Sequence, residues 1–279
     1  MAKIRVVTDS ASDLPDEIAT SLGIDIVALS IRFGEEEFVD RRDLTPTEFW
    51  AKCKGSKVLP ETAAPSPGAF AAVFQAAKDA GYDGVIVISL SSLLSATMQA
   101  ATLGAESLGG QFPISIVDSK AVSMAIGLIA IELAELAATG ATLDQLTTLA
   151  NDLVSRAGVV GTIDTLEHLI KGGRVKGAKA LLGSMLSIKP ILVLKDGLVD
   201  EAGRQRTRTK AIAHCAAAAQ SASPLRRIAL VHGNAPDVDA AASALADVKT
   251  EYPLIVADMG STVGTHGGPG ILAVCWIRA

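Results

Sequence analysis

The chain has 279 residues, a net charge of −5 and a hydrophobic fraction of 49%. This length allows one large domain or two modest ones, with a core that needs no disulfide or metal to hold it together. The mildly acidic balance, with 25 Lys and Arg against 30 Asp and Glu, argues against a nucleic-acid partner and against an anionic membrane surface.

The N-terminal segment does not have the pattern of a secretory signal, because Asp9 follows its two cations after only a few apolar residues. No apolar stretch reaches the roughly 18 uninterrupted residues of a membrane span. The nearest one, 121–138, contains Ser123, Glu132 and Glu135. We therefore expect a soluble, cytoplasmic protein without stable membrane insertion.

The first half of the chain alternates short apolar runs with helical segments. Strands are predicted at 3–8, 24–29, 85–90 and 114–117. Helices are predicted after Pro15, from Thr45, at 68–82, at 93–108, over the Ala-rich segment that follows 119, and at 142–156. We interpret 34–43 as a charged stretch between elements. Such alternation indicates right-handed crossovers and one parallel sheet.

The second half has a different character, beginning near Gly158. Asp196-Gly197 lies between two apolar runs, which predicts a two-residue hairpin and an at least partly antiparallel sheet. Further strands are predicted at 159–163, 227–232, 254–258 and 272–277, and helices at 164–170, 178–186, 207–220 and 236–248. The fold class is therefore α/β with two domains. Residues 1–158 form an N-terminal parallel sheet flanked by helices, and residues 159–279 form a C-terminal α/β domain with a mixed, partly antiparallel sheet.

Polar residues follow three of the predicted strands in the first half: Thr8-Asp9-Ser10, Ser91-Ser92 with Ser95, and Asp118-Ser119-Lys120. Each of these side chains can cap the helix that follows it. Ligands of open parallel sheets, however, bind outside the carboxyl ends of the strands. Three polar groups at one edge of a sheet therefore favour a ligand site there.

The hydroxyls of residues 91–97 have two interpretations besides capping. They can donate to an anion at a helix N-terminus, or one of them can be a nucleophile. No GxSxG motif surrounds them. A serine nucleophile also needs a base and an oxyanion hole. His266 is the candidate base, but the sequence shows no triad order.

Residues 264–270 are rich in glycine and precede a terminal strand. One interpretation is a sharp turn with positive φ angles; the other is a loop that brings backbone and the His266 imidazole against a ligand. The chain has neither a phosphate-binding loop motif nor a dinucleotide-binding glycine motif.

The cysteines and histidines do not show the spacing of metal ligands. Their positions are Cys53, Cys215, Cys275, His168, His214, His232 and His266. The carboxylates show no metal pattern either. We expect reduced thiols without a disulfide, no metal and no cofactor.

Taken together, these segments resemble the DegV family, which includes fatty-acid-binding proteins of the FakB type. The resemblance covers nearly the whole chain and follows the order of the family's motifs. It rests on Val7–Pro15, Thr62 with Pro65-Ser66-Pro67, Ser91–Thr97, Val117–Lys120, Asp164–Arg174, Leu182–Pro190, Arg206-Thr207-Arg208 and Gly264–Gly270.

The resemblance implies two α/β domains with a long-chain fatty acid buried between them as the ligand. It places the carboxylate of that acid on Thr62, Ser95 and His266, with Ser92 as a second candidate. The sequence departs from the family's pattern at Ala63 and Ala64, which replace Ser-Gln, and at Ala96, which replaces a glycine. The hydroxyls remain, but the hydrogen-bond network around them is thinner.

The resemblance also implies a partner, the catalytic subunit of a fatty acid kinase, which converts the presented acid to an acyl phosphate. In that partnership Arg174 and Arg206 contact the kinase or the transferred phosphate, although both can equally be solvated surface arginines. The chain itself is then a non-catalytic carrier.

The rival interpretation is an esterase or acyl-phosphate hydrolase that uses Ser95 and His266 in the same cleft. A third, a structural interaction module, is weakened by the polar residues at the strand ends.

Overall fold

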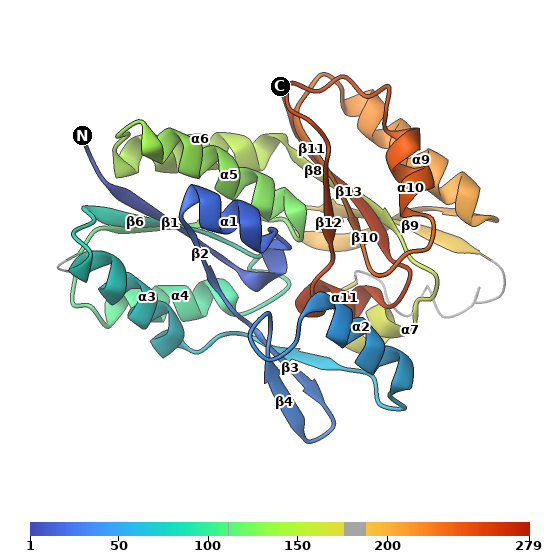
Figure 1. The fold of residues 1–279 in the computed structure, drawn as a ribbon, viewed down its shortest axis with the longest axis horizontal. Helices are drawn as coiled ribbons and strands as arrows, with labels where there is room; N and C mark the ends of the chain where they lie inside the picture. The colour runs from blue at the N-terminus through green and yellow to red at the C-terminus, as the bar shows by residue number, and fades with distance from the viewer. Residues whose placement is uncertain (111, 176–187) are drawn as a thin grey trace.

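The computed structural model describes residues 1–110, 112–175 and 188–279. The chain forms two large sheets that lie side by side (Figure 1), with helices above and below the first and outside the second. The helix predicted at 178–186 lies outside the described residues.

The first sheet has four parallel strands in the order β2-β1-β6-β7. Their bounds are Ile24–Val27 for β2, Ile4–Asp9 for β1, Gly84–Ser89 for β6 and Ile114–Asp118 for β7. All six residues of β6 are buried, as expected of a central strand covered on both faces. This confirms the predicted parallel sheet.

Helices cover both faces of this sheet (Figure 1). One face packs on α3 (Pro67–Asp79) and α4 (Thr97–Glu106). Phe70 and Phe74 of α3 are fully buried there. The other face packs on α1 (Asp16–Leu22), α5 (Met124–Ala138) and α6 (Leu143–Arg156). A short 3-10 helix, η1 (Ser10–Ser12), follows β1.

The second sheet has six strands in the order β10-β9-β8-β13-β11-β12. The pair β11 and β12 is parallel, and the other neighbours are antiparallel. The bounds are Leu198–Gln205 for β10, Lys189–Lys195 for β9, Ala157–Thr162 for β8, Leu272–Arg278 for β13, Leu225–His232 for β11 and Ile255–Asp258 for β12. The mixed sheet is as predicted, and its β9–β10 turn has positive φ at both Asp196 and Gly197.

Helices α9 (Arg208–Ala222) and α10 (Val238–Ala244) cover the outer face of the second sheet. Its inner face packs on α5 of the first half, and one apolar cluster runs through both halves. The domain boundary near 158 stays a prediction.

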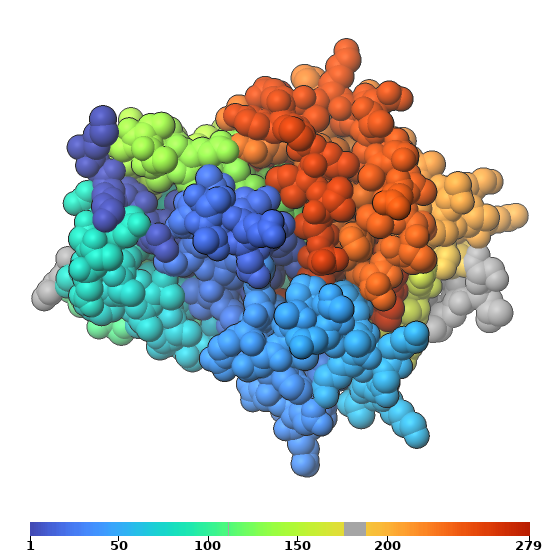
Figure 2. Space-filling view, in the orientation of Figure 1, coloured from blue at the N-terminus to red at the C-terminus, as the bar shows by residue number. Residues whose placement is uncertain are grey.

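A small third sheet was not predicted. Strands β3 (Ser30–Phe33), β4 (Glu36–Val39) and β5 (Glu61–Ala63) form an antiparallel sheet in the order β4-β3-β5. Part of the predicted charged stretch is therefore a hairpin. Helix α2 (Pro46–Gly55), capped by Thr45 and Glu48, follows it. In Figure 2 this blue N-terminal region extends under the orange and red C-terminal half.

Two further predictions were wrong in detail. The helix predicted at 93–108 begins only at Thr97, because residues 92–94 form turns. The glycine-rich stretch 264–270 is mostly helical, since α11 spans Ser261–Gly267 and only Gly268 and Gly270 have positive φ. A Cβ on Gly264 would lie 2.7 Å from the Trp50 ring, so close packing rather than a turn requires that glycine.

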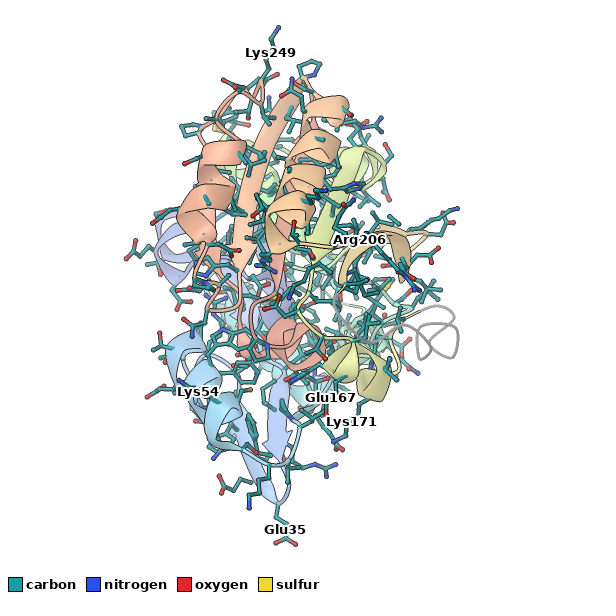
Figure 3. The ribbon with its side chains drawn as sticks, turned by 90° about the vertical axis from the view of Figure 1, so that its right-hand side faces the viewer. Glu35, Lys54, Glu167, Lys171, Arg206 and Lys249 are labelled. Atoms are coloured by element: carbon teal, nitrogen blue, oxygen red, sulfur yellow. The ribbon has the colours of Figure 1, made fainter. Side chains whose placement is uncertain are left out.

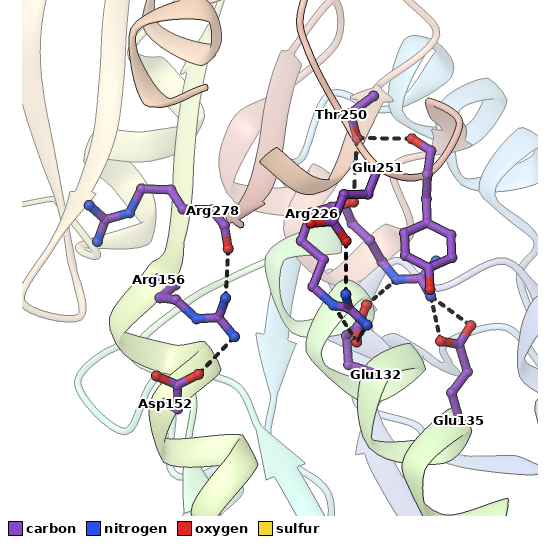
Figure 4. Close-up of polar contacts among 10 residues, drawn as sticks. Glu132, Glu135, Asp152, Arg156, Arg226, Thr250, Glu251 and Arg278 are labelled. Atoms are coloured by element: carbon purple, nitrogen blue, oxygen red, sulfur yellow. Dashed lines mark hydrogen bonds and ion pairs between the residues drawn. The ribbon is translucent and has the colours of Figure 1, made fainter. Parts of the chain in front are cut away.

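A cluster of ion pairs, the charged seam, joins the two halves (Figure 4). It consists of Glu132 and Glu135 on α5, Arg226 and Arg227 on β11, and Glu251. Arg227 Nε donates to Glu132 Oε1 over 2.5 Å, and both side chains are nearly fully buried. In such a pair each buried charge compensates the other, so removing one partner leaves an uncompensated buried charge.

Candidate functional site

A cavity of about 890 Å³, including its mouth, lies between the two large sheets. Its walls come from both halves: Leu90, Leu94 and Val122 belong to the first, and strands β8, β9, β10 and β13 together with helix α11 belong to the second. Most of the lining side chains are aliphatic: Leu29, Leu90, Leu94, Val122, Val159, Ile163, Leu169, Leu192, Val193, Leu194, Val199, Val263 and Ile271. This interior suits an apolar chain of small cross-section.

Polar side chains also line the cavity. We call the part formed by Thr62, Ser95, Arg174 and His266 the mouth; Ser123, Thr162 and Thr262 line the rest. The structure thus brings together three of the four predicted carboxylate-binding residues, and one of the two arginines predicted to contact a kinase or a phosphate.

Thr62 and His266 form a hydrogen-bonded pair. Thr62 lies on β5, opposite Ile31 of β3, and His266 lies in the last turn of α11. The distance from Thr62 Oγ1 to His266 Nε2 is 3.0 Å. The third sheet therefore has a definite function in the architecture, since it carries Thr62 to an imidazole from the far end of the chain.

The pKa of His266 is lowered to about 4, first by burial and then by the charge of Arg174 and by His168. The ring is therefore neutral near pH 7 and carries one proton. Its buried Nδ1 has no hydrogen-bond partner among the described residues. A proton on Nε2 avoids burying an unpaired N–H group. Nε2–H then donates to Thr62 Oγ1, and the Thr62 hydroxyl is free to donate to a ligand.

Ser95 lies in the loop before α4. Its Oγ is 2.8 Å from Thr97 Oγ1 and accepts from the Thr97 backbone N–H over 3.3 Å. Ser95 therefore combines the two alternatives that its sequence left open: it takes part in a local turn and also lines the cavity.

Arg174 follows α7 (Glu167–Gly172), after Gly173 in a left-handed conformation. Its Nη1 donates to the Gly172 carbonyl over 2.6 Å and its Nε to the Leu94 carbonyl over 3.4 Å. These bonds hold the guanidinium at the mouth and connect the second half to the 91–97 loop. Within the described ranges no carboxylate lies within 4.0 Å of it.

Ser92 and Arg206 lie outside the cavity lining. Ser92 is exposed, and its Oγ and backbone N–H donate to the Asp118 carboxylate over 2.6 and 3.2 Å. The predicted meeting of polar residues at neighbouring strand ends is thus real, but this pair is not part of the cavity lining. Arg206 is exposed between β10 and α9 (Figure 3).

Three buried carboxyl groups, those of Asp9, Asp13 and Asp40, border the other part of the lining. We call them the carboxyl seam. Asp13 accepts from the Gly260 N–H over 2.8 Å and from Ser123 Oγ over 2.5 Å. Thr262 Oγ1 donates to Asp40 over 2.6 Å. Ser123 and Thr262 both line the cavity. These bonds attach the η1 region to α11. The sequence of residues 7–15 alone did not predict this contact.

Burial dominates the acidity of this seam. Desolvation raises the pKa of Asp13 to about 7 and the pKa of Asp9 to about 6, against the hydrogen bonds that each carboxyl accepts. Asp9 accepts from the backbone N–H groups of Leu90 and Ala11. Near neutral pH, part of the negative charge of these carboxyls is therefore neutralised by bound protons rather than by cationic side chains.

The residues of a serine hydrolase do not assemble at the mouth. Ser95 Oγ bonds Thr97 and not His266, and His266 Nε2 bonds Thr62. No described carboxylate orients the ring, because Nδ1 has no partner there. Nucleophile, base and orienting group must be in contact for that chemistry.

Two features are absent from residues 1–110, 112–175 and 188–279. No helix in them is both long enough and apolar enough to cross a bilayer. They also contain no group of three or more His, Cys, Asp or Glu side chains that could hold a metal ion.

Fold and site together define a two-sheet α/β protein with an aliphatic cavity between the sheets and one polar mouth. The family model DegV, described as "Uncharacterised protein, DegV family", matches residues 3–279, so the chain belongs to the DegV family. A DegV domain-containing protein of Listeria monocytogenes is 34% identical over 280 residues, which cover 98% of each chain. One of Streptomyces coelicolor is 34% identical over 97% of each chain.

Solved structures of the family share the fold. A DegV family protein of Thermus thermophilus, described by its fatty acid binding, superposes with a TM-score of 0.91 at 32% identity, over 99% of this chain and all of that one. DegV of Bacillus subtilis, a fatty acid binding protein, superposes with a TM-score of 0.87 at 30% identity over the full length of both. A stearic acid-binding protein of Eubacterium ventriosum has a TM-score of 0.86 at 26% identity, over all of this chain and 98% of that one.

Proposed function

We propose that the protein binds a long-chain fatty acid, with the tail in the cavity and the carboxylate at the mouth. The observation that carries this proposal is the placement of the Thr62–His266 pair and Ser95 on the lining of a mainly aliphatic cavity. The fatty-acid-binding relatives of the same fold support it.

The mouth matches the chemistry of a carboxylate. Thr62 and Ser95 supply hydroxyl donors, and charge-assisted hydrogen bonds of this kind are shorter and stronger than neutral ones. Arg174 adds a positive charge on the same lining. His266 acts behind Thr62 as a positioning residue, because its neutral ring fixes which way the threonine hydroxyl points.

The cavity supplies most of the affinity. Burial contributes about 0.8 kcal/mol per methylene, so about 14 methylenes give roughly 11 kcal/mol before the costs of association. The polar contacts therefore determine the orientation of the acid more than its affinity.

We further propose that the bound carboxylate is presented to a separate fatty acid kinase. A carboxylate oxygen would bond to the γ-phosphorus of ATP held by the kinase, and the bond from that phosphorus to the β-phosphate oxygen would break, giving acyl phosphate and ADP. Arg206 is exposed and lies outside the cavity, which suits a contact with that partner. The chain itself is then a carrier and not an enzyme.

Mass spectrometry after denaturing extraction tests the binding proposal. We expect purified protein to carry fatty acid at about one per chain, as a single buried site implies. Extraction of no fatty acid, together with no binding when fatty acid is added, would contradict the proposal. Ester or acyl-phosphate hydrolysis by the purified chain, lost in Ser95→Ala, would establish the rival enzyme instead.

The presentation proposal needs the kinase in the assay. Arg206→Ala should keep fatty-acid affinity unchanged while acyl-phosphate formation falls by about tenfold or more. Unchanged formation would make Arg206 a solvated surface residue. Arg174→Ala is expected to lower both quantities, because Arg174 also lines the mouth.

A further inference from the structure

The carboxyl seam has no cationic partner in the part of the chain that the structure describes. Asp9, Asp13 and Asp40 are 1%, 3% and 1% exposed, and none of them forms an ion pair there. The cation whose charge acts on Asp13 is Arg41, which is paired with Asp16 instead. Because burial without a cation favours the neutral form of a carboxyl, the folded protein binds protons at this seam.

The seam also joins the two halves of the protein at the wall of the cavity. Asp13 follows η1 of the first half, and it accepts from the Gly260 N–H, just before α11, and from the Ser123 hydroxyl, just before α5. Asp40 accepts from the Thr262 hydroxyl of α11. Since Ser123 and Thr262 line the cavity, a change of charge in the seam acts directly on the cavity wall.

Two bonded residues of this joint have strained backbones. Asp13 has a φ of +50°, and Ser123 has a φ of +61° with a ψ of −151°. The second combination belongs almost only to glycine and costs on the order of 1–3 kcal/mol in other residues. The Asp13 carboxyl and the Ala11 carbonyl, which accept from the Ser123 hydroxyl and N–H, hold this conformation. A weaker joint therefore lets this part of the wall relax.

Asp13 changes charge near neutral pH. Burial raises its pKa to about 7, and the charge of Asp40 adds to this increase, against the hydrogen bonds from Ser123 and Gly260. Because the folded pKa lies above the ordinary 3.8, the stability that the neutral carboxyl contributes is lost as the pH rises from about 4 through about 7. The ionised carboxyl then lies near Asp40, whose buried Oδ1 has no partner among the described groups.

Other titratable groups around Asp13 keep their charge from about pH 7 to about pH 9. Burial raises the pKa of Asp9 to about 6, so that carboxyl is already ionised. Burial raises the pKa of the Cys275 thiol to about 12 and lowers that of His266 on α11 to about 4, so both are neutral. The guanidinium of Arg41 is always charged.

A bound tail and a proton on Asp13 favour each other. Hydrocarbon against Ser123 and Thr262 solvates charge less well than water does, so a tail in the cavity raises the pKa of Asp13 further. By linkage, the protein with a neutral Asp13 binds the tail more tightly.

We propose that the carboxyl seam is a proton-dependent latch, which holds the cavity closed around a bound acid while Asp13 carries a proton and loosens as Asp13 ionises. The inference rests on the proposed fatty-acid binding and adds a control of retention to it. A rise in pH then favours release of the acid without any change at the mouth.

Equilibrium dialysis of radiolabelled palmitate against the full chain, from about pH 7 to about pH 9, tests the latch. The Kd of wild type should rise about tenfold over this range. Asp13→Asn should keep the affinity that wild type has near pH 7, because the amide imitates the neutral acid and asparagine accepts a positive φ. Asp79→Asn is the matched control, since Asp79 is exposed at the end of α3; its pH dependence should be that of wild type.

Ser123→Gly provides a second measurement that leaves Asp13 in place. Glycine adopts the positive φ freely, and loss of the hydroxyl removes a hydrogen bond that lowers the pKa of Asp13. The midpoint of the affinity loss should therefore move to higher pH.

The outcomes separate the latch from the proposed function. An affinity of wild type that does not change with pH, an equal loss in Asp13→Asn, or an unmoved midpoint in Ser123→Gly overturns the latch and leaves fatty-acid binding intact. Loss of the pH dependence in Asp79→Asn also overturns the latch. Absence of palmitate binding at every pH overturns both.

Discussion

The mouth and the interior of the cavity are built differently. The mouth residues Thr62, Arg174 and His266 come from a strand edge, the end of one short helix and the last turn of another, and hydrogen bonds fix them. The interior is aliphatic, and its side chains come from strands β8, β9 and β10, from helices α7 and α11 and from loops, where apolar packing rather than hydrogen bonding positions them.

This difference separates two properties of binding. The interior determines how much apolar surface a ligand buries, and hence its affinity. The mouth determines the orientation of the ligand, and its contacts contribute less than the interior to the free energy of binding. Changes in the interior should therefore have larger effects on affinity than changes at the mouth.

The largest effect is expected in the interior. Leu194→Trp places a larger side chain into the cavity from β9, and β-strands in general accommodate aromatic residues. If the indole excludes about four methylenes, affinity for palmitate falls by about 3 kcal/mol, more than about hundredfold. Decanoate, which needs less of the cavity, should lose much less in the same calorimetric titration. Equal losses for both acids would show that the indole disrupts the mouth or the fold.

At the mouth, Thr62→Ala and Ser95→Ala should each weaken binding of fatty acid by about 1–3 kcal/mol, because a buried charged group loses one donor. Ser92→Ala is the matched control, since Ser92 is exposed and bonds Asp118. Its affinity should equal that of wild type. A loss in Ser92→Ala, with wild-type affinity in the other two, would place the carboxylate at Ser92.

A smaller effect tests the positioning function of His266. A Cβ on Gly172 would lie 2.3 Å from His266 Nδ1, so Gly172→Ala must displace the ring and weaken its bond to Thr62. We expect about tenfold weaker binding of fatty acid, or about 1.4 kcal/mol, with little change in the free energy of unfolding.

Gly55→Ala is the control for that change. Gly55, like Gly172, is the last residue of its helix, but nothing lies within 4 Å of its added Cβ. Affinity in Gly55→Ala should be that of wild type. Equal affinities in both variants would show that the position of the His266 ring does not matter for binding.

The smallest expected effect is the response of His266 to pH. Its folded pKa of about 4 lies below the ordinary 6.5. The neutral ring therefore contributes to stability above about pH 6.5, and this contribution is lost as the pH falls from about 6.5 to about 4. The NMR signal of its Cε1, assigned by its loss in His266→Gln, should not titrate between about pH 5 and pH 8. A midpoint near 6.5 would contradict the burial of the ring, and one raised above about 7 would make the ring a charged ligand of the carboxylate.

The sequence predicted the elements whose pattern is local. β6 is a continuous apolar run, α2 has its cap at Thr45 and Glu48, and the β9–β10 turn has Asp196-Gly197. The third sheet was missed because β3 and β4 are short and Glu36 and Glu37 are exposed, so the hairpin reads as charged surface.

The candidate site was predictable through motifs but not through geometry. Apart from the family motif, nothing in the sequence distinguishes Ser92 from Ser95, yet the turns of residues 91–96 direct one to Asp118 and the other to the cavity. The fixed position of Arg174 depends on carbonyls of Gly172 and Leu94, one of them 80 residues away. Such contacts follow from tertiary packing and leave no local signal.

The charged seam has a consequence for the evolution of the chain. Eleven of the 15 residues of α5 are buried, and the acidic partners of Arg227 lie on that helix. A fragment of residues 1–158 would lose the sheet that covers α5 and leave Glu132 without either arginine. We expect it to bind a hydrophobic dye such as ANS and to aggregate. Neither half could therefore be exchanged or inherited alone, and gene fusions or splits near the centre of the chain should be selected against, although each half has a sheet of its own.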